Sequence, residues 1–359
     1  MSAYIIGGEF GLSEDVFLQA KTDNSHIRYA RKHHIYVDTG RSALLLALTG
    51  IIQQGGKKEA WLPYYCCSSA ITPFRQLDFK INYYSMGDDL QNPQLLPDSL
   101  DGEVFLFINY FGKENYGITG WLDKLSEDGP GFIIEDNVQS LLSTHLGRYG
   151  DFIINSYRKF LPQPDGAVLA CDIPIEYSLQ PADETFISKK LIAKIIRENH
   201  GDSKSFLTLL AEAENQLDNY IRPRSMSYLS RYILDRTDLK EIAETRRLNW
   251  FYLSKLLQSM QLTNEEVFPL YNSLEAEEVP LGFPVRVQPR HRDKLRDYLM
   301  KQNIFCPVHW PLPSAAKTDA YENDINLSKS ILTLPIDQRL VPDALSYMAE
   351  QILRFYTKM

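Results

Sequence analysis

Short apolar runs alternate with helix-like stretches over the first half of the chain. The runs EAWLPYYC, EVFLFINYFG and GFIIEDN have strand length, and HIYVDTGRSALLLALTGIIQQGG is typical of a strand, a glycine turn and a helix that stops at Gly55. AITPFRQLDFKINYYSM predicts a helix followed by a strand, and WLDKLSED predicts a helix. Apolar strands separated by helices indicate a mostly parallel sheet buried on both faces, with ligands expected at the carboxyl ends of its strands.

The pattern changes after about residue 185. SFLTLLAEAENQLDNY and DLKEIAETRRLNWFYLSKLLQSM each carry one apolar helical stripe, and the second begins with an Asp238/Glu241 pair placed like a capping box. LGFPVRV, HRDKLRDYLMKQN and IFCPVHW predict strand, helix and strand, and DALSYMAEQILRFY predicts a closing helix. We therefore predict a large α/β lobe with an irregular N-terminal arm over residues 1–235, and a connecting helix with a smaller α+β lobe over residues 236–359.

The composition excludes several classes of protein. With 44% hydrophobic and 23% charged residues the 359-residue chain is an ordinary globular protein, and its formal net charge of −8 argues against nucleic-acid or anionic-membrane partners. No apolar run approaches the roughly 20 residues that span a bilayer, and no secretory signal is evident, so we expect a cytoplasmic protein. The four cysteines have neither metal-ligand nor disulfide spacing, so we expect buried thiols and no metal site.

Three stretches carry candidate chemistry. DTGRSAL puts Gly40 at a strand-to-helix turn, where backbone amides can bind an anion and where Arg41 and Ser42 add a charge and a hydroxyl; an ordinary turn and cap explains this motif about as well. FIIEDNVQS delivers Asp136 to a strand end, where an aspartate usually caps a helix or forms a salt bridge, but where it can also keep a ring nitrogen protonated.

The third stretch is SYRKF, which places Lys159 just past the next apolar strand. A lone lysine is mostly a surface residue, but an amine of lowered pKa in a crevice can bond covalently to an aldehyde. Taken together, the three stretches meet the demands of pyridoxal phosphate, whose phosphate, pyridine nitrogen and aldehyde each need a partner. The chain has no GxGxxG turn and no GxxxxGK[ST] loop, which disfavours dinucleotide and P-loop nucleotide binding.

These motifs resemble the DegT/DnrJ/StrS family of fold-type I pyridoxal-phosphate enzymes, the sugar aminotransferases. TGRSALLLAL is similar to the family's SGTxAL turn, WLPYYCCSSAI to its proline-led strand, and FINYFG to its VHxYG segment. FIIEDNVQS is similar to (V/I)EDxAQ, and YGDFIINSYRKFLPQPDGA to GDxxxxSF…K…GEGG. RDKLRDYLMKQNIFCPVHWPLP and ILTLPIDQRL resemble stretches of the family's small lobe, so the resemblance runs through most of the chain.

The resemblance implies a role for each motif. Lys159 would bond to the cofactor aldehyde and move the proton during amino transfer, with pyridoxamine phosphate as the intermediate form of the cofactor. Asp136 would pair with the pyridine nitrogen and Gln139 with the phenolic oxygen. The phosphate would be held by Gly40, Arg41, Ser42 and Ser156. The implied reaction moves an amino group from an amino acid, with glutamate the expected donor, to a keto sugar on a nucleotide.

Several positions depart from the family pattern. Arg41 replaces the usual Thr, and Cys67 stands where an aromatic residue usually stacks on the ring, so stacking is expected from Tyr65 or Tyr64 instead or is absent. Two residues are missing between Ser156 and Lys159, and the GEGG turn reads DGAV. The stretch through which a second subunit of a homodimer reaches the phosphate reads RPRSMS, where Arg224 or Ser225 substitutes.

Two further predictions and two alternatives complete the interpretation. By the same resemblance His309 and Trp310 lie near the substrate mouth, although core filling explains them equally well. One alternative function is dehydration or elimination on a nucleotide sugar with the same cofactor; the family's dehydratases carry a histidine at the lysine position, so Lys159 favours transamination. The other alternative is a cofactor-binding or regulatory protein without catalysis, which the altered turn and the missing stacking residue support.

Overall fold

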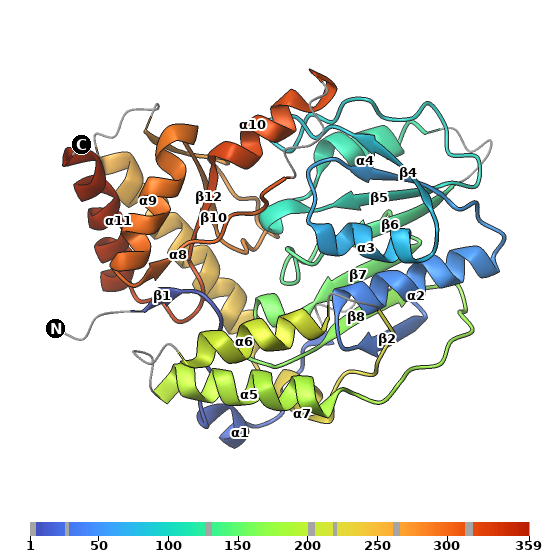
Figure 1. Ribbon diagram of the computed structural model, residues 1–359, viewed down its shortest axis with the longest axis horizontal. Coiled ribbons are helices and arrows are strands. Elements are labelled where there is room, and N and C mark those ends of the chain that lie inside the picture. Colours follow the sequence, from blue (N-terminus) through green and yellow to red (C-terminus); the bar gives the residue numbers. More distant parts are fainter. Residues whose placement is uncertain are drawn as a thin grey trace.

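The computed structural model describes residues 5–25, 29–125, 131–199, 205–217, 221–260, 266–312 and 319–358. Its main feature is a seven-stranded sheet of order β2-β8-β7-β6-β5-β3-β4 (Figure 1). The strands are β2 (His33–Val37), β3 (Glu59–Pro63), β4 (Lys80–Tyr84), β5 (Val104–Ile108), β6 (Phe132–Asp136), β7 (Phe152–Ser156) and β8 (Ala167–Cys171). Only β8 runs antiparallel to its neighbours, so the predicted, mostly parallel sheet is confirmed.

Burial explains why the strands read as unbroken apolar runs. Every residue of β5, β7 and β8 is buried, because these central strands are covered on both faces. The helices of this part are α2 (Gly40–Gln53), α3 (Ser68–Gln76), α4 (Tyr116–Leu122), α5 (Glu184–Asn199), α6 (Ser205–Gln216) and α7 (Tyr228–Leu234). Helix α2 packs on β2, β7 and β8 and stops before Gly55, whose φ of 82° ends it as predicted.

A second, smaller group of elements carries its own core. Its antiparallel sheet has the order β12-β10-β9, formed by β9 (Val267–Pro269), β10 (Phe283–Val287) and β12 (Ile331–Leu334). Its helices are α8 (Leu239–Ser259), α9 (Pro289–Lys301), α10 (Glu322–Ser330) and α11 (Pro342–Thr357). Helix α8 begins where predicted, because the Asp238 side chain accepts hydrogen bonds from the amides of Lys240 and Glu241.

The N-terminal arm reaches from one group of elements to the other. It contains β1 (Ile6–Gly7) and α1 (Asp15–Leu18), and β1 pairs in parallel with β11 (Ile304–Phe305). Ile6 packs into the core of the smaller group, although the arm was predicted with the large lobe. The division at residue 235 stays a prediction.

The structure differs from the prediction at two elements. The strand expected over IFCPVHW is limited to Ile304–Phe305, since Pro307 has no amide hydrogen to continue a ladder. Helix α5 was not predicted at all. Within the described residues, no helix combines the length and the apolar character that crossing a membrane requires.

Candidate active site

Neighbouring strands bring Asp136 and Lys159 to the same edge of the large sheet. Asp136 is the last residue of β6, and Lys159 ends the 3-10 turn η3 (Tyr157–Lys159) that follows β7 directly. The two strands are parallel partners, with Asp136 opposite Ile154. The carboxyl ends of parallel strands are where α/β sheets place their ligands, so these two predicted residues meet where a site is expected.

Burial controls the charge of Asp136. The side chain is 7% exposed, and its Oδ1 accepts a hydrogen bond of 2.9 Å from the Val138 amide. Desolvation raises its pKa to about 6, while that hydrogen bond and the charge of Lys159 favour the ionised form. A positive partner closer to the carboxylate, such as a protonated ring nitrogen, would keep Asp136 ionised.

The amine of Lys159 responds to the same burial in the opposite sense. Desolvation lowers its pKa, and the neighbouring Arg158 adds to this effect, whereas Cys67 and Asp136 oppose it. A lysine of lowered pKa has more of the neutral amine that attacks a carbonyl carbon.

Gln139 is held with its amide nitrogen free to donate. It is 1% exposed, and its Oε1 accepts a hydrogen bond of 2.9 Å from the Phe111 amide. Phe111 takes a φ of 55°, a left-handed conformation that is rare for a bulky residue. In the described part of the chain, Gln139 Nε2 is buried without a hydrogen-bond partner. A buried donor of this kind is expected to serve a ligand acceptor.

The predicted phosphate turn starts helix α2. Thr39 caps the helix by accepting the Ser42 amide, and the Thr39 hydroxyl contacts Ser42 Oγ at 3.2 Å. A cavity of about 90 Å³ opens here, lined by Thr39, Arg41 and Ser42 and also by Arg224. A β-carbon at Gly40 would meet only Val138, at 3.5 Å, so the protein's own packing leaves space beside this turn.

The charged groups around this turn differ from the prediction. The Arg41 guanidinium donates to the Leu217 carbonyl (3.2 Å) and to Ser69 Oγ (2.9 Å). Two buried carboxylates, Asp38 and Asp165, line the same small cavity, and desolvation raises the pKa of both. The cavity therefore combines a helix N-terminus with acids that are more readily protonated than usual.

The other predicted phosphate contacts are spread around the turn. Arg224 donates to the Pro181 carbonyl and lies 3.7 Å from Asp183, while Ser225 pairs through its backbone with Gln180. Ser156 is buried at the end of β7, and its amide donates to Asn155 Oδ1. Of these three, Arg224 shares the small cavity with the turn.

Tyr65 and Cys67 lie on the segment between β3 and α3. Tyr65 is fully buried, and its hydroxyl donates to the carbonyl of His309. Cys67 is half-buried at the start of α3 and influences the Lys159 amine. Tyr64 stacks on Tyr321, with ring centroids 4.2 Å apart. Through its hydrogen bond to the His309 carbonyl, Tyr65 joins the two groups of elements.

His309 and Trp310 reach Lys159 from the smaller group of elements. His309 Nδ1 and Thr333 Oγ1 share a hydrogen bond of 3.0 Å. Desolvation and the charge of Lys159 lower the pKa of His309 to about 3. It is therefore neutral near pH 7. The Trp310 indole centroid lies 5.8 Å from Lys159 Nζ. The structure thus brings both predicted substrate residues to the lysine.

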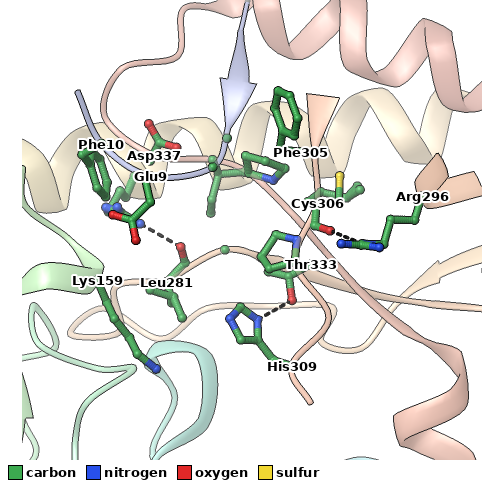
Figure 2. Close-up of a pocket in the computed structure, with 18 of the residues that line it drawn as sticks. Glu9, Phe10, Lys159, Leu281, Arg296, Phe305, Cys306, His309, Thr333 and Asp337 are labelled. Carbon is green, nitrogen blue, oxygen red and sulfur yellow. Dashed lines mark hydrogen bonds between the residues drawn. The ribbon is translucent and has the colours of Figure 1, made fainter. Parts of the chain in front are cut away.

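A larger cavity of about 450 Å³ adjoins Lys159 and His309 (Figure 2). Glu9 and Phe10 of the N-terminal arm form part of its wall, opposite residues that follow β11 and β12. Most of the lining is apolar, with Phe305, Cys306, Leu334 and Ile336 among its members. An organic substrate next to the lysine has room here.

Sequence reasoning missed the buried charges behind this cavity. Glu9 lies 3.4 Å from Lys190 Nζ and 3.1 Å from Lys194 Nζ, and Glu214 lies 3.0 Å from Arg158. The two lysine side chains are only 1% and 2% exposed. The sequence feature that could have revealed these buried charges is a basic stripe at spacings of four and three residues, formed by Lys190, Lys194 and Arg197.

The residues present fit pyridoxal phosphate at three of its four contact points. Asp136 suits the pyridine nitrogen, Lys159 the aldehyde, and the unpartnered Gln139 Nε2 the phenolic oxygen. The phosphate has the α2 N-terminus and Ser42. Asp38 and Asp165 suit it only when they are protonated, which their raised pKa values favour.

Comparison with known proteins defines the fold. It is the fold of sugar aminotransferases, so the fold implied by the motifs is confirmed. Sugar aminotransferase CalS13 from Micromonospora echinospora is similar with a TM-score of 0.65 and 13% identity over 97% of this chain and 99% of that one. A DegT DnrJ EryC1 StrS aminotransferase from Brucella abortus is similar with a TM-score of 0.59 and 15% identity over 90% and 86%.

The protein ntda from Bacillus subtilis, solved with the bound cofactor PMP, is similar with a TM-score of 0.60 and 16% identity over 90% of this chain and 74% of that one. No family model and no curated protein matches the sequence. At these identities the likeness establishes the fold alone.

Proposed function

We propose that this protein is a pyridoxal-phosphate-dependent aminotransferase that moves an amino group from an amino acid, glutamate by preference, to a keto sugar. The observation that carries the proposal is the pairing of a buried carboxylate, Asp136, with a lysine of lowered pKa, Lys159, at the ends of adjacent parallel strands. The cofactor-bearing neighbour ntda and the sugar aminotransferase neighbours support the choice of cofactor and reaction.

Each residue has a defined task in this reaction. When bound, the cofactor supplies an electron sink for the carbon that loses a proton. Asp136 would hold the pyridine nitrogen in its protonated form, and Gln139 Nε2 would donate to the phenolic oxygen. Lys159 would hold the aldehyde, and its neutral amine would remove a proton from one carbon and deliver it to another. The neutral His309 and the Trp310 indole bound the space beside Lys159 Nζ.

The acceptor is proposed to be a nucleotide-linked keto sugar, with pyridoxamine phosphate as the intermediate form of the cofactor, in polysaccharide or secondary-metabolite biosynthesis. The cavity of about 450 Å³ beside Lys159 is large enough for a hexose with part of its carrier. We place the enzyme in the cytoplasm, because its four cysteines are free thiols.

The active enzyme is proposed to be a homodimer with shared sites. The loop of Arg224 and Ser225 leads directly into α7, where Tyr228 is 86% exposed. Leu18 of α1 is 83% exposed, and the Tyr232 hydroxyl donates to the Phe17 carbonyl, so α1 and α7 are neighbours (Figure 1) that each expose an apolar side chain. A second copy seated there would approach the phosphate turn.

A second candidate is a protein that binds the cofactor without turnover. The altered turn that reads DGAV and the absence of a ring at Cys67 favour it, since both change the surroundings of the cofactor. This candidate predicts cofactor binding but no reaction with an amino donor.

The test mixes the purified protein with pyridoxal phosphate and then L-glutamate. We expect a visible absorbance band of lysine-bound cofactor, borohydride trapping of the cofactor mass on the peptide that contains Lys159, and loss of the band when glutamate is added. Lys159→Ala should show no trapping. A band that glutamate leaves unchanged supports the second candidate, and trapping on another lysine contradicts the assignment. Keto-sugar nucleotides are then added to the glutamate-treated protein, and the one that takes up the amino group is identified as the acceptor.

A further inference from the structure

The aromatic side chain over the Lys159 amine belongs to the smaller group of elements. The Trp310 indole centroid lies 5.8 Å from Nζ, within the roughly 6 Å over which a cation interacts with an aromatic face. The residue at the position expected to stack on a cofactor ring, Cys67, has no ring. Something other than a large-lobe aromatic residue must therefore cover a ring bound to Lys159.

Both tyrosines beside Cys67 are committed to other contacts. Tyr65 is fully buried, and its hydroxyl donates to the His309 carbonyl. Tyr64 lies parallel to Tyr321, at an interplanar angle of 5°. Both tyrosine side chains therefore already have partners within the fold.

Trp310 is fixed in place without any ligand. Its carbonyl accepts a hydrogen bond of 2.7 Å from Ser328 Oγ, which in turn accepts the Leu312 amide at 2.9 Å. Its indole packs against Tyr65 and Tyr110, with ring centroids 5.9 and 6.1 Å away. A wall that is ordered in advance loses little conformational freedom when a ligand binds.

The geometry points to a new role for this residue: we propose that Trp310 packs against the cofactor ring held at Lys159, replacing the aromatic residue that is absent at Cys67. This inference rests on the proposed function. Aromatic rings attract one another at centroid separations of about 4.5–7 Å, and a ring bonded through Nζ would lie close to the indole.

The placement has a consequence for binding. The cofactor would be held from two sides, by Asp136 and Gln139 of the large sheet and by Trp310 of the smaller group of elements. Cofactor binding would then depend on the contact between Tyr65 and the segment of His309 and Trp310.

Tryptophan fluorescence during titration with pyridoxal phosphate tests the inference. The chain has four tryptophans, and Trp121→Phe is the matched control, since Trp121 packs on Phe105 near the amino end of β5. We expect quenching in the wild type and in Trp121→Phe, and a clearly smaller fractional loss in Trp310→Phe. Trp310→Ala should weaken cofactor binding by about tenfold, and Trp310→Phe by less than about threefold.

The outcomes separate this inference from the function on which it rests. A wild type that shows the lysine-bound cofactor band, but whose quenching and affinity are unchanged by Trp310→Phe, overturns the role of Trp310 and leaves the proposed function standing. A wild type without any cofactor band contradicts both. Because Trp310→Phe keeps an aromatic ring in the wall, it decides the question even if Trp310→Ala fails to fold.

Discussion

At the scale of single residues, the site depends on two side chains that burial shifts in opposite directions. Desolvation disfavours charge, so it raises the pKa of Asp136 and lowers that of Lys159. Their mutual attraction opposes both shifts. A cofactor bonded to Lys159, with a protonated ring nitrogen opposite Asp136, would remove the charge from the lysine and make the buried carboxylate favourable.

Asp136→Asn tests the cost of the buried carboxylate in the cofactor-free protein. The folded-state pKa of about 6 lies above the unfolded value, so stability is lost as pH rises from about 4 through 6. The neutral amide escapes this loss, and we expect the variant to be more stable than wild type by up to about 3 kcal/mol at pH 8 and nearly equal to it near pH 4. Urea unfolding at the two pH values measures the difference. Asp297→Asn on the exposed face of α9 is the control, and a gain that does not depend on pH would refute the explanation.

The sequence predicted the positions of Asp136 and Lys159 in the fold better than it predicted side-chain contacts. Lys159 and Asp136 follow from their places at strand ends, because the topology of a parallel sheet fixes where those ends lie. Arg41 and Tyr65 contact other partners than expected, since the direction of a long side chain depends on neighbours distant in sequence. Glu9 carried no signal, because its lysine partners lie 181 and 185 positions away.

At the scale of elements, helix α5 binds the N-terminal arm along one basic stripe. Lys190 and Lys194 meet Glu9, Arg197 donates to the Gly7 carbonyl at 2.6 Å, and the Leu12 amide donates to the Lys194 carbonyl. Such a helix is hard to recognise from its sequence, since its buried face mixes three charged residues with Phe186 and Ala193. The alternating strands and the stripe of α8 were predicted because most of their buried positions are apolar.

Glu9→Gln should loosen the arm. It removes the carboxylate that pairs with Lys194 and one of the two that pair with Lys190, which keeps Glu214. Because the Glu9 side chain is 40% exposed, we expect a loss of about 1 to 2 kcal/mol at pH 7. The lysines hold the pKa of Glu9 well below its usual value, so the wild-type advantage exists above the unfolded pKa and disappears as pH falls. Hydrogen exchange at the Leu12 amide reports the effect. Glu184→Gln, at the exposed start of α5, should leave that exchange unchanged. Equal acceleration of the exchange in both variants would contradict a specific role of Glu9 in holding the arm.

At the scale of the whole molecule, the site lies where three parts of the chain meet. The large sheet supplies Asp136 and Lys159, the smaller group of elements supplies His309 and Trp310, and the arm closes the cavity with Glu9 and Phe10. The fold could be predicted from the alternation of strands and helices. The cavity could not, because it depends on how these parts pack together.

The apolar side chains that α1 and α7 expose lead to a prediction about assembly. We expect the wild type to sediment as a dimer, and Tyr228→Lys to shift it toward the monomer, because a charge would be buried in the interface. Leu248→Lys changes a residue of α8 that is 69% exposed and should leave the dimer intact. Sedimentation velocity at micromolar concentration distinguishes these cases; a monomeric wild type would rule out sites shared between two copies.

The pairing of β1 with β11 has a consequence for how the protein is made. Ile6 leaves the ribosome well before Ile304, its partner in the ladder, has been synthesised. Contacts between such distant positions form slowly, since a long loop must close before they contribute any stability. The arm thus reaches its native position late, and the cavity beside Lys159 gains the wall formed by Glu9 and Phe10 only late in folding.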